Sequence, residues 1–308
     1  MKGKKTLIIA LGGNALIRKG QTGTLTEQLE NLKIPAKQIA QIFYEGEYRM
    51  VITHGNGPQV GNLLLMQEEK RSIEIPEMPL EILVAMTQGQ IGYMIEVSLD
   101  NEFMTLGIEN QMIVTVLTYV QVDDKDNAFK NPTKPIGPVY ERKKPNFIKT
   151  EKGYRKVVPS PTPLKIVEKN EIKAMLNEGM IVIACGGGGI PVTKERRKFE
   201  GIEAVIDKDL ASAKLGEDIN ANMLIMATDV SNVYLNYGKK NQGKIGKLSV
   251  QDAEKYLLQE QFSEGSMKPK IEAAVNFLKS GGERAVICHI NDIKKAVDGK
   301  AGTQIVNE

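Results

Sequence analysis

The chain has 308 residues, of which 41% are hydrophobic and 26% are charged, and these values are ordinary for a globular enzyme. Its 41 basic and 38 acidic residues nearly balance, so the net charge of +3 excludes a polybasic protein that binds nucleic acid or an anionic membrane surface. No segment approaches the roughly 18 consecutive apolar residues that a membrane-spanning helix needs.

The first residues of the chain do not fit a signal peptide. A basic start precedes an apolar stretch of about seven residues, but this stretch runs into Gly-Gly-Asn, which suits a buried first strand. Cys185 and Cys288 each end a strand-like run without metal-ligand spacing, which indicates buried free thiols rather than a disulfide. Because His54 and His289 are the only histidines, a histidine-rich metal site is not expected. We therefore expect a cytoplasmic protein.

Short apolar runs alternate with helix-length segments along most of the chain. The runs predict strands at 5–11, 49–53, 112–118, 180–184, 222–227, 232–237 and 284–289. Helical periodicity predicts helices at 26–45, from near Val60, at 79–106, 164–178, 207–217, 250–258 and 267–279. Strands separated by helices form βαβ units, so we expect an α/β fold with a mainly parallel sheet.

Three of the predicted strands end in glycine-rich loops. Their sequences are TLIIALGGN at 6–14, MVITHGNG at 50–57 and IVIACGGGG at 181–189. In an open α/β sheet, the loops that leave the carboxyl ends of parallel strands line one crevice, where ligands bind. Glycine lets backbone N–H groups approach a ligand closely, and phosphate is the ligand best matched to such groups. The pattern predicts one shared phosphate site.

Residues 119–163 interrupt this alternation. Seven of the chain's 13 prolines fall there beside a charged stretch, so neither a long helix nor a central strand is expected. Long excursions within compact domains often carry a function. We interpret 119–163 as a small protruding subdomain, acting as a lid and inserted into a single domain that spans residues 1–308.

Two familiar nucleotide-binding signatures are not matched. Gly55, Gly57 and Gly61 are spaced one residue too widely for the dinucleotide fingerprint. Residues 238–244 match a P-loop as far as its lysine, but Ile245 stands where a serine or threonine is required. A nucleotide phosphate would therefore be held by another design.

Charged residues stand at two predicted helix starts. At the first, Asp207 fits a helix N-cap, which is a purely structural role. In the functional interpretation, Lys208 neutralises a phosphate oxygen, while Asp209 orients lysines or binds Mg²⁺ through water. The local sequence leaves the two interpretations equally open. Lys270 lies near the second helix start, where the helix dipole disfavours a lysine; this position fits an anionic partner, although solvated lysines are also common at such sites.

Two further residues stand at positions that suit a ligand contact. Lys134 lies between Pro132 and Pro135, whose stiff backbone suits a side chain with a fixed direction, although proline also serves simply to shape loops. Asp229 follows the predicted strand MLIMAT, where it would either reach a nucleotide or cap a turn.

Nine short motifs occur in order across nearly the whole chain. They are ALGGNAL (10–16), VITHGNGPQVG (51–61), NPTKPIGP (131–138), VVPSP (157–161), CGGGGIPV (185–192), VIDKDLA (205–211), TDV (228–230), GSMKPK (265–270) and AGT (301–303). Any one of them is weak, but nine in sequence are highly specific. With this set, the chain resembles the carbamate kinases, which belong to the amino-acid kinase superfamily.

The resemblance implies a three-layer α/β/α sandwich with a mainly parallel central sheet, a small protruding subdomain and, usually, a homodimer. It also implies reversible, Mg²⁺-dependent phosphoryl transfer between carbamoyl phosphate with ADP and carbamate with ATP. The expected direction is ATP synthesis in arginine or purine fermentation. The Mg²⁺ would be held by the nucleotide phosphates, with no direct protein ligand.

The resemblance also implies roles for individual residues. Two glycine loops would hold the transferred phosphoryl group and the acceptor, and they are represented here by Gly12, Gly13, Asn14, Gly55, Asn56 and Gly57. Lys208 and Lys270 would contact the phosphates, and Asp209 would organise these lysines. Lys134 would reach the reacting group from the protruding subdomain. We assign the nucleotide to Gly187, Gly188, Asp229, Met267 and Thr303.

Ala10 distinguishes this chain from the acylamino-acid kinases, which typically carry a lysine at that place in the first strand; Lys134 is the expected substitute. A kinase for a larger acylated amino acid would need an arginine to clamp its carboxylate, and only Arg18 lies close in sequence to the glycine loops. A nucleotide-binding regulatory module without catalysis is a second alternative. His54 adjoins the Gly-Asn-Gly turn, which would suit a catalytic role, but we expect it to hold the turn by a hydrogen bond. We assign no role to the basic loop 194–198.

Overall fold

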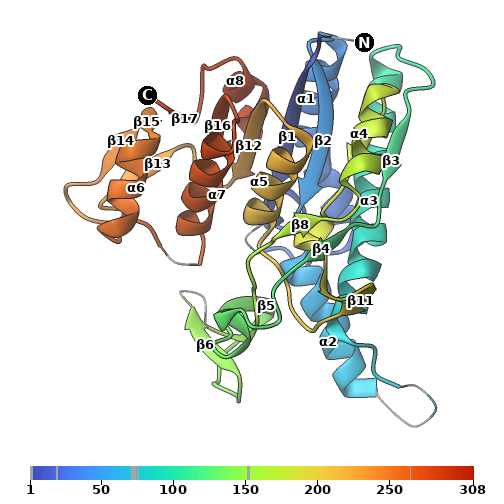
Figure 1. Cartoon of the computed structure of the whole chain (residues 1–308), viewed down its shortest axis with the longest axis vertical. Helices are drawn as coiled ribbons and strands as arrows, with labels where there is room; N and C mark the ends of the chain where they lie inside the picture. The colour runs from blue at the N-terminus through green and yellow to red at the C-terminus, as the bar shows by residue number, and fades with distance from the viewer. Residues whose placement is uncertain (1–2, 19, 71–73, 75, 151–152, 264) are drawn as a thin grey trace.

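A mainly parallel sheet of eight strands forms the centre of the computed structural model, which describes residues 3–18, 20–70, 74, 76–150, 153–263 and 265–308 (Figure 1). The side chains of Asn14 and Lys70 lie outside this description. In spatial order the strands are β15 (Lys247–Ser249), β17 (Thr303–Val306), β16 (Arg284–His289), β12 (Met223–Thr228), β1 (Lys5–Leu11), β2 (Tyr48–His54), β9 (Ile181–Ile183) and β3 (Ile113–Thr115). The pairing of β16 with β17 is antiparallel, and the other pairings in this sheet are parallel.

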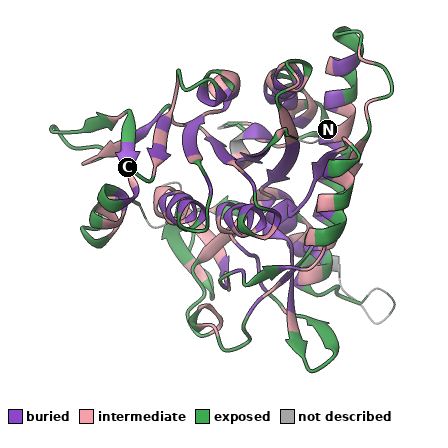
Figure 2. Cartoon of the chain, turned by 45° about the horizontal axis from the view of Figure 1, so that its top comes forward, coloured by how far each residue is buried: buried purple, intermediate pink, exposed green. Residues whose placement is uncertain are grey.

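Helices cover both faces of this sheet. One face packs on α1 (Leu25–Tyr44), α3 (Leu80–Thr105) and α8 (Ile293–Val297), and the other on α4 (Lys169–Asn177), α5 (Lys208–Ile219), α6 (Val250–Leu258) and α7 (Met267–Lys279). Strands buried on both faces are mostly apolar, and Figure 2 shows them as a buried layer between helices. This arrangement confirms the predicted three-layer α/β/α sandwich.

The strand register brings the predicted glycine loops together. Leu11 of β1 pairs with His54 of β2 on one side and with Ala227 of β12 on the other, so these three strands end at the same level. The loops that follow β1, β2 and β12 therefore meet at one edge of the sheet, as the strand direction requires.

Three smaller sheets lie outside the central one. A four-stranded sheet runs β11 (Lys198–Gly201), β10 (Ile190–Glu195), β4 (Tyr119–Gln121) and β8 (Lys165–Ile166). A hairpin pairs β13 (Val233–Leu235) with β14 (Gly243–Ile245). A three-stranded sheet runs β5 (Lys134–Tyr140), β7 (Gly153–Val158) and β6 (Phe147–Thr150); we call it the lobe, and it extends from the lower end of the molecule in Figure 1.

The structure corrects several predicted boundaries. The predicted helix 164–178 begins only at Lys169, because residues 165–166 pair with β4 as strand β8. The predicted strand at 112–118 shortens to β3, and that at 232–237 becomes β13 of the hairpin, outside the central sheet. Within the predicted subdomain 119–163, only residues 134–158 form the lobe, since residues 119–121 pair with β10. A lid function of this region remains a prediction.

The lobe is docked against α2 (Gly57–Lys70) by a backbone contact. A Cβ atom added at Gly61 would lie 2.0 Å from the Cα of Gly137, so the two backbones touch where no side chain fits. Arg155 donates hydrogen bonds of 3.0 and 2.8 Å to the Gly137 carbonyl and so braces the same point from inside the lobe. Lys156 forms an ion pair with Glu68 of α2. These contacts fix the lobe on the α2 side.

No helix within the described ranges combines the length and the apolar character that a bilayer crossing requires.

Candidate active site

The loops after β1 and β2 meet at the carboxyl edge of the sheet. The backbone N–H of Gly12 donates to the Ala227 carbonyl at 3.0 Å, and a Cβ at Gly12 would lie 2.8 Å from the same oxygen. Gly55 donates to the Leu11 carbonyl at 3.1 Å, and its absent Cβ would lie 3.7 Å from the Gly13 nitrogen. Glycine is therefore required at Gly12, and the first two predicted glycine loops form one surface.

Asn56 and Gly57 of the predicted set have a local structural reason, whereas the side chain of Asn14 is not described. Asn14 lies in a short 3₁₀ turn, η1 (Gly13–Ala15), and its side chain falls outside the described atoms. Asn56 is 2% exposed, and its amide donates to the Thr87 hydroxyl at 2.9 Å, so this side chain fixes the loop on α3. Gly57 is the first residue of α2, whose N-terminal N–H groups therefore lie beside the Gly55 loop.

The N-terminus of α5 places a buried lysine against this surface. Asp207 caps the helix, because its Oδ1 accepts the backbone N–H of Asp209 at 2.9 Å and that of Leu210 at 3.4 Å. This confirms the predicted N-cap. The next residue, Lys208, is only 8% exposed, and its side-chain stem lies 3.5 Å from the Cβ position of Gly55.

Asp209 joins two of the predicted lysines. Its Oδ1 forms an ion pair with the Lys208 ammonium, and its Oδ2 accepts from Lys270 Nζ at 3.0 Å. The carboxylate is 3% exposed, so it is buried between the two cations. Lys270 reaches it from the first turn of α7. The geometry agrees with an organising role of Asp209 for these two lysines.

Lys134 reaches the same region from the lobe. It is the first residue of β5, and its Nζ lies 2.6 Å from Asp207 Oδ2. Three ammonium groups from separate elements thus converge on two adjacent carboxylates at one helix N-terminus. Such a cluster, beside backbone N–H groups of the glycine loops, favours a bound anion.

Burial and mutual charge set the protonation of this cluster. Burial lowers the pKa of Lys208, and the Asp209 carboxylate opposes this effect only in part. Burial also acts to lower the pKa of Lys270, but the charges of Asp209 and Asp207 outweigh it and raise that pKa. Burial acts to raise the pKa of both carboxyl groups, yet the lysine charges around them hold each pKa below its ordinary value. The carboxylates are therefore ionised at neutral pH.

The third glycine loop packs beneath the second. A Cβ at Gly187 would lie 2.2 Å from Asn56 Nδ2, and a Cβ at Gly188 would lie 2.3 Å from the Ile206 carbonyl oxygen. Both glycines are buried and have positive φ, which a side chain would disfavour. The atoms nearest to both Cβ positions are protein atoms of the neighbouring loops. The assignment of Gly187 and Gly188 to the nucleotide remains a prediction.

The remaining predicted nucleotide residues separate into two groups. Thr303 has no exposed surface, and its hydroxyl accepts from the Val233 N–H at 2.8 Å and donates to the Ile245 carbonyl at 2.6 Å. It joins the β13–β14 hairpin to β17, so its side chain is unavailable to a nucleotide. Asp229 is exposed, and its charge contributes to the raised pKa of Lys270. Met267 begins α7 and is half-buried.

His54 is buried at the end of β2. Its Nδ1 lies 3.1 Å from the Gly55 carbonyl oxygen, which agrees with the predicted hydrogen bond to the turn. A Cβ at Gly186 would lie 2.4 Å from His54 Nε2, so the ring fills the space between two glycine loops. Burial, together with the charge of Lys208, lowers the pKa of His54 to about 4. The ring is therefore neutral at pH 7.

The basic loop 194–198 is the turn of the β10–β11 hairpin. Arg196 has a positive φ of 53°, and the turn is exposed. The Lys194 ammonium lies 5.5 Å from the centre of the Phe199 ring, a local cation–π contact. Nothing in these contacts links the loop to the lysine cluster.

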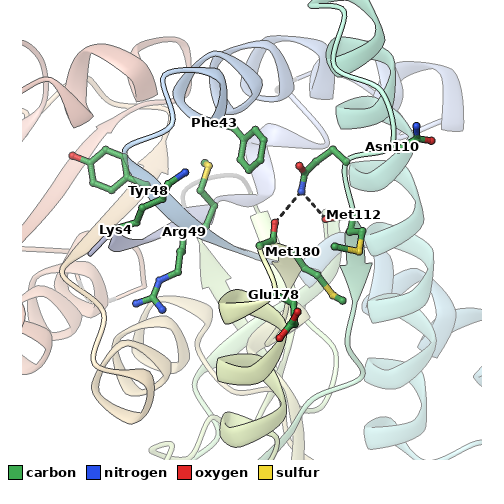
Figure 3. Close-up of a pocket in the computed structure, with 11 residues that line it drawn as sticks. Lys4, Phe43, Tyr48, Arg49, Asn110, Met112, Glu178 and Met180 are labelled. Carbon is green, nitrogen blue, oxygen red and sulfur yellow. Dashed lines mark hydrogen bonds between the residues drawn. The ribbon is translucent and has the colours of Figure 1, made fainter. Parts of the chain in front are cut away.

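A cavity of about 210 Å³ lies at the opposite, amino edge of the central sheet. It is lined by residues just before or at the start of the strands, among them Tyr48, Met112 and Met180. Figure 3 shows the Arg49 guanidinium and the Tyr48 ring pointing away from Phe43 and Met180. Because this cavity has neither the glycine loops nor the buried lysine cluster, we place the candidate active site at the carboxyl edge.

Sequence reasoning missed the contacts that hold the lobe in place. The pairing of Lys134 with Asp207 and the backbone contact between Gly61 and Gly137 join residues 73 or more positions apart. A weak signal was available for one of them, since a glycine inside a helix, such as Gly61, often marks a close backbone approach. Arg155 carries no comparable signal in the sequence.

Comparison with known proteins identifies the family. Residues 5–289 match the model of the amino acid kinase family. The chain belongs to the amino acid kinase family. Among relatives of this amino acid kinase, the carbamate kinase of Thermococcus kodakarensis is 46% identical over 315 residues, covering 99% of this chain and all of the relative.

Solved structures agree with this family. The carbamate kinase from Giardia lamblia bound to AMP-PNP has a TM-score of 0.90 at 39% identity, covering 99% of both chains. A second structure of the Giardia enzyme, thiocarbamoylated by disulfiram on a cysteine, has a TM-score of 0.87 at 37% identity, again over 99% of both chains. The amino acid kinase fold thus extends over nearly the whole chain.

Proposed function

We propose that the chain is a carbamate kinase, which transfers a phosphoryl group reversibly between carbamoyl phosphate with ADP and carbamate with ATP. The observation that carries the proposal is the Lys208–Asp209–Lys270 bridge directly beside the two glycine loops. The names of the relatives support the choice of substrate.

The arrangement suits phosphoryl transfer because this reaction depends on positioning and on stabilising charge at the equatorial oxygens. In the proposal, the backbone N–H groups of Gly13 and Gly57 hold the transferred group, while those of Gly12 and Gly55 bond to the Ala227 and Leu11 carbonyls and shape the two loops. Lys208 and Lys270 neutralise its charge, and Asp209 keeps the two ammonium groups apart and aimed at it. Lys134 contributes the third ammonium group from the lobe.

The reaction requires no general base, because carbamate is already an anion at neutral pH. His54 agrees with this requirement, since it is buried and neutral and holds the Gly55 carbonyl. With a pKa of about 4 the ring is not an imidazolium at pH 7, and it uses its Nδ1–H in the hydrogen bond to the Gly55 carbonyl. We assign it the structural role.

The nucleotide is proposed to lie between Asp229 and Met267, next to Lys270. The Giardia enzyme was solved with AMP-PNP, which supports a triphosphate site in this fold. Asp207 and Asp209 are both engaged by lysines, so these residues fit an Mg²⁺ ion that is held by nucleotide phosphates rather than by side chains. When bound, Mg²⁺ would supply charge neutralisation at the transferred phosphate.

A homodimer through α3 is part of the proposal. Ile82, Met86 and Tyr93 form one stripe along this helix at spacings of four and seven residues, and they are 42, 47 and 63% exposed. Leu117, in the nearby segment between β3 and β4, is 51% exposed. Exposed apolar stripes of this kind commonly mark interfaces. Light scattering of Met86→Glu against wild type tests it: a shift from dimer to monomer is expected, and a monomeric wild type would contradict it.

The activity is tested by a coupled assay with ADP, Mg²⁺ and carbamoyl phosphate, in which formation of ATP is measured. ATP formation supports the proposal. The alternative of an acylamino-acid kinase predicts instead ADP formation from ATP with an acylated glutamate, and the regulatory module predicts nucleotide binding without turnover. The direction toward ATP synthesis in arginine or purine fermentation, and a cytoplasmic location, remain predictions.

A further inference from the structure

We propose that Asp207 is a positioning residue for Lys134: it holds the lysine of the lobe at the candidate active site while it caps α5. The inference rests on the proposed function, because it assigns Lys134 to the same reaction. It adds a residue with no assigned role beyond helix capping, and it gives the two neighbouring aspartates separate tasks.

The two carboxylate oxygens of Asp207 have different partners. Oδ1 accepts the backbone N–H groups of Asp209 and Leu210, at 2.9 and 3.4 Å, and thereby caps the helix. Oδ2 accepts from Lys134 Nζ at 2.6 Å. The capping role therefore uses one oxygen and leaves the other for the lobe, so the two roles can be separated by substitution.

The Lys134–Asp207 ion pair is shielded from solvent, so the attraction between its charges is weakened less than in an exposed pair. The side chains of Lys134 and Asp207 are 22% and 18% exposed, well below the exposure of ordinary surface ion pairs. Lys208 and Lys270 act on the same carboxylate and, with Lys134, keep its pKa low despite burial. Asp207 therefore carries its charge throughout the neutral pH range, and Lys134 has an ionised partner there.

The other attachments of the lobe do not hold Lys134. The Gly61–Gly137 backbone contact, the hydrogen bonds of Arg155 and the Lys156–Glu68 ion pair all lie on the α2 side. Within the described residues, the Lys134–Asp207 pair is the ion pair that links the lobe to α5. A lysine has four rotatable side-chain bonds, so without this partner its ammonium group would sample many positions.

The structure thus divides the three lysines between two aspartates. Asp209 holds the two lysines that come from helices of the core, and Asp207 holds the one that comes from the lobe. An anion that enters beside the glycine loops meets all three ammonium groups already in place. Pre-placed groups of this kind accelerate a reaction because their ordering does not have to be achieved in the transition state.

Asp207→Asn separates positioning from capping. Asparagine is as good an N-cap as aspartate, so the amide oxygen can keep both hydrogen bonds to α5 while the negative charge is lost. We expect the melting temperature to change little and kcat/KM for carbamoyl phosphate to fall roughly ten-fold. The KM for ADP is expected to stay unchanged, because Lys134 is assigned to the other substrate. Asp207→Ser, which also caps, serves as the second variant.

A double-mutant cycle shows whether Asp207 acts through Lys134. Once Lys134→Ala has removed the ammonium group, adding Asp207→Asn should cause no further loss of kcat/KM. Glu68→Gln is the matched control, because it breaks the other ion pair of the lobe at a site away from the lysine cluster, and it should leave kcat unchanged. Full activity of Asp207→Asn, or losses that multiply in the double variant, would overturn the inference.

A second measurement does not depend on activity. The rate at which an amine-reactive reagent labels Lys134, followed by mass spectrometry, should rise several-fold in Asp207→Asn and stay at the wild-type value in Glu68→Gln. If wild type forms no ATP, the proposed function fails, yet faster labelling would still support the pairing itself. Equal labelling of Lys134 in wild type and Asp207→Asn would overturn the pairing whatever the activity.

Discussion

The same buried strands run between the carboxyl edge and the amino edge of the central sheet, but different loops and side chains lie at the two edges. At the carboxyl edge, glycine loops leave room for backbone N–H groups, and three lysines share two carboxylates. At the amino edge, a cavity of about 210 Å³ is lined by Phe43, Met50 and Met180, and the charged end of Arg49 points away from it (Figure 3). Strand direction, rather than cavity size, therefore locates the chemistry.

The difference has an energetic side. Buried charges are tolerated at the carboxyl edge because each carboxylate has at least one lysine beside it, and Asp207 also accepts two helix N–H groups. At the amino edge the charged residues that line the cavity, Lys4, Arg49 and Glu178, are exposed or half-buried, so no such cost arises. We therefore expect substitutions at the carboxyl edge to change activity first, and substitutions at the amino edge to change stability alone.

The largest effect is expected from the bridged lysines. Lys208→Ala or Lys270→Ala should lower kcat by about 10²–10³-fold, the scale of losing one preorganised donor to a developing charge. Steady-state ATP formation measures this loss. Lys279→Ala, which removes an exposed lysine of the same helix as Lys270, is the control and should keep the wild-type rate. Near-normal turnover in both site variants would remove these lysines from the mechanism.

The next largest effect is expected at the backbone contact of the lobe. A Cβ in Gly61→Ala would lie 2.0 Å from the Gly137 backbone, so the lobe must move away from α2 and carry Lys134 with it. We expect kcat to fall roughly ten-fold. Gly243→Ala in β14 is the matched control, because it is exposed and its Cβ would meet no atom within 4 Å. Equal kinetics for the two variants would contradict the proposed link between lobe docking and activity.

His54 should separate stability from activity at the carboxyl edge. The pKa of His54 is about 4 in the folded protein, compared with the ordinary value of 6.5 that applies to the unfolded chain. Between these pH values the unfolded chain binds a proton that the folded chain does not, so stability should fall as the pH decreases through this window, by about 3 kcal/mol in all.

Urea unfolding at pH 7, 5.5 and 4 measures this dependence. His54→Gln should flatten it within the window and keep most of the kcat at pH 7. A variant with the wild-type pH dependence would show that other groups cause it, and a variant without activity would give His54 a catalytic role.

The smallest effect is expected at the amino edge. Gln111 donates to the carbonyl oxygens of Met112 and Gly179, at 3.1 and 3.0 Å, and so ties the segments before β3 and β9 together. Gln111→Ala should lower the free energy of unfolding by about 1 kcal/mol and leave kcat unchanged. A clear loss of kcat in this variant would mean that the two edges of the sheet are coupled.

The sequence predicts the layers and the active edge because both depend on local patterns. Apolar runs such as those before Gly12 and Gly55 end where the strands end, and the parallel direction then places their loops together. The partner of Lys134 could not be predicted in the same way. The N-cap role alone explains an aspartate at position 207. The contact of its second oxygen with Lys134 of the lobe depends on the tertiary structure, which the local sequence does not reveal.

Other differences between the predicted and the observed structure also arise from long-range contacts. Residues 165–166 continue an apparently helical pattern, but pairing with β4 takes them into a strand. Thr303 is expected from the AGT motif to contact the nucleotide, yet its hydroxyl is used by the backbone of the β13–β14 hairpin. Contacts between residues far apart in the sequence determine the structure at both positions, and neither composition nor periodicity predicts such contacts.

Both cysteines of the chain are buried and free, and their burial limits the reaction of the protein with thiol reagents. Burial raises the pKa of both thiols, that of Cys288 to about 12, so the reactive thiolate is scarce as well as shielded. The Giardia enzyme carries a cysteine that disulfiram modifies. In this chain an electrophile of that type would find no accessible nucleophilic sulfur until the sheet itself opened, so resistance to thiol reagents would measure how rarely the core unfolds.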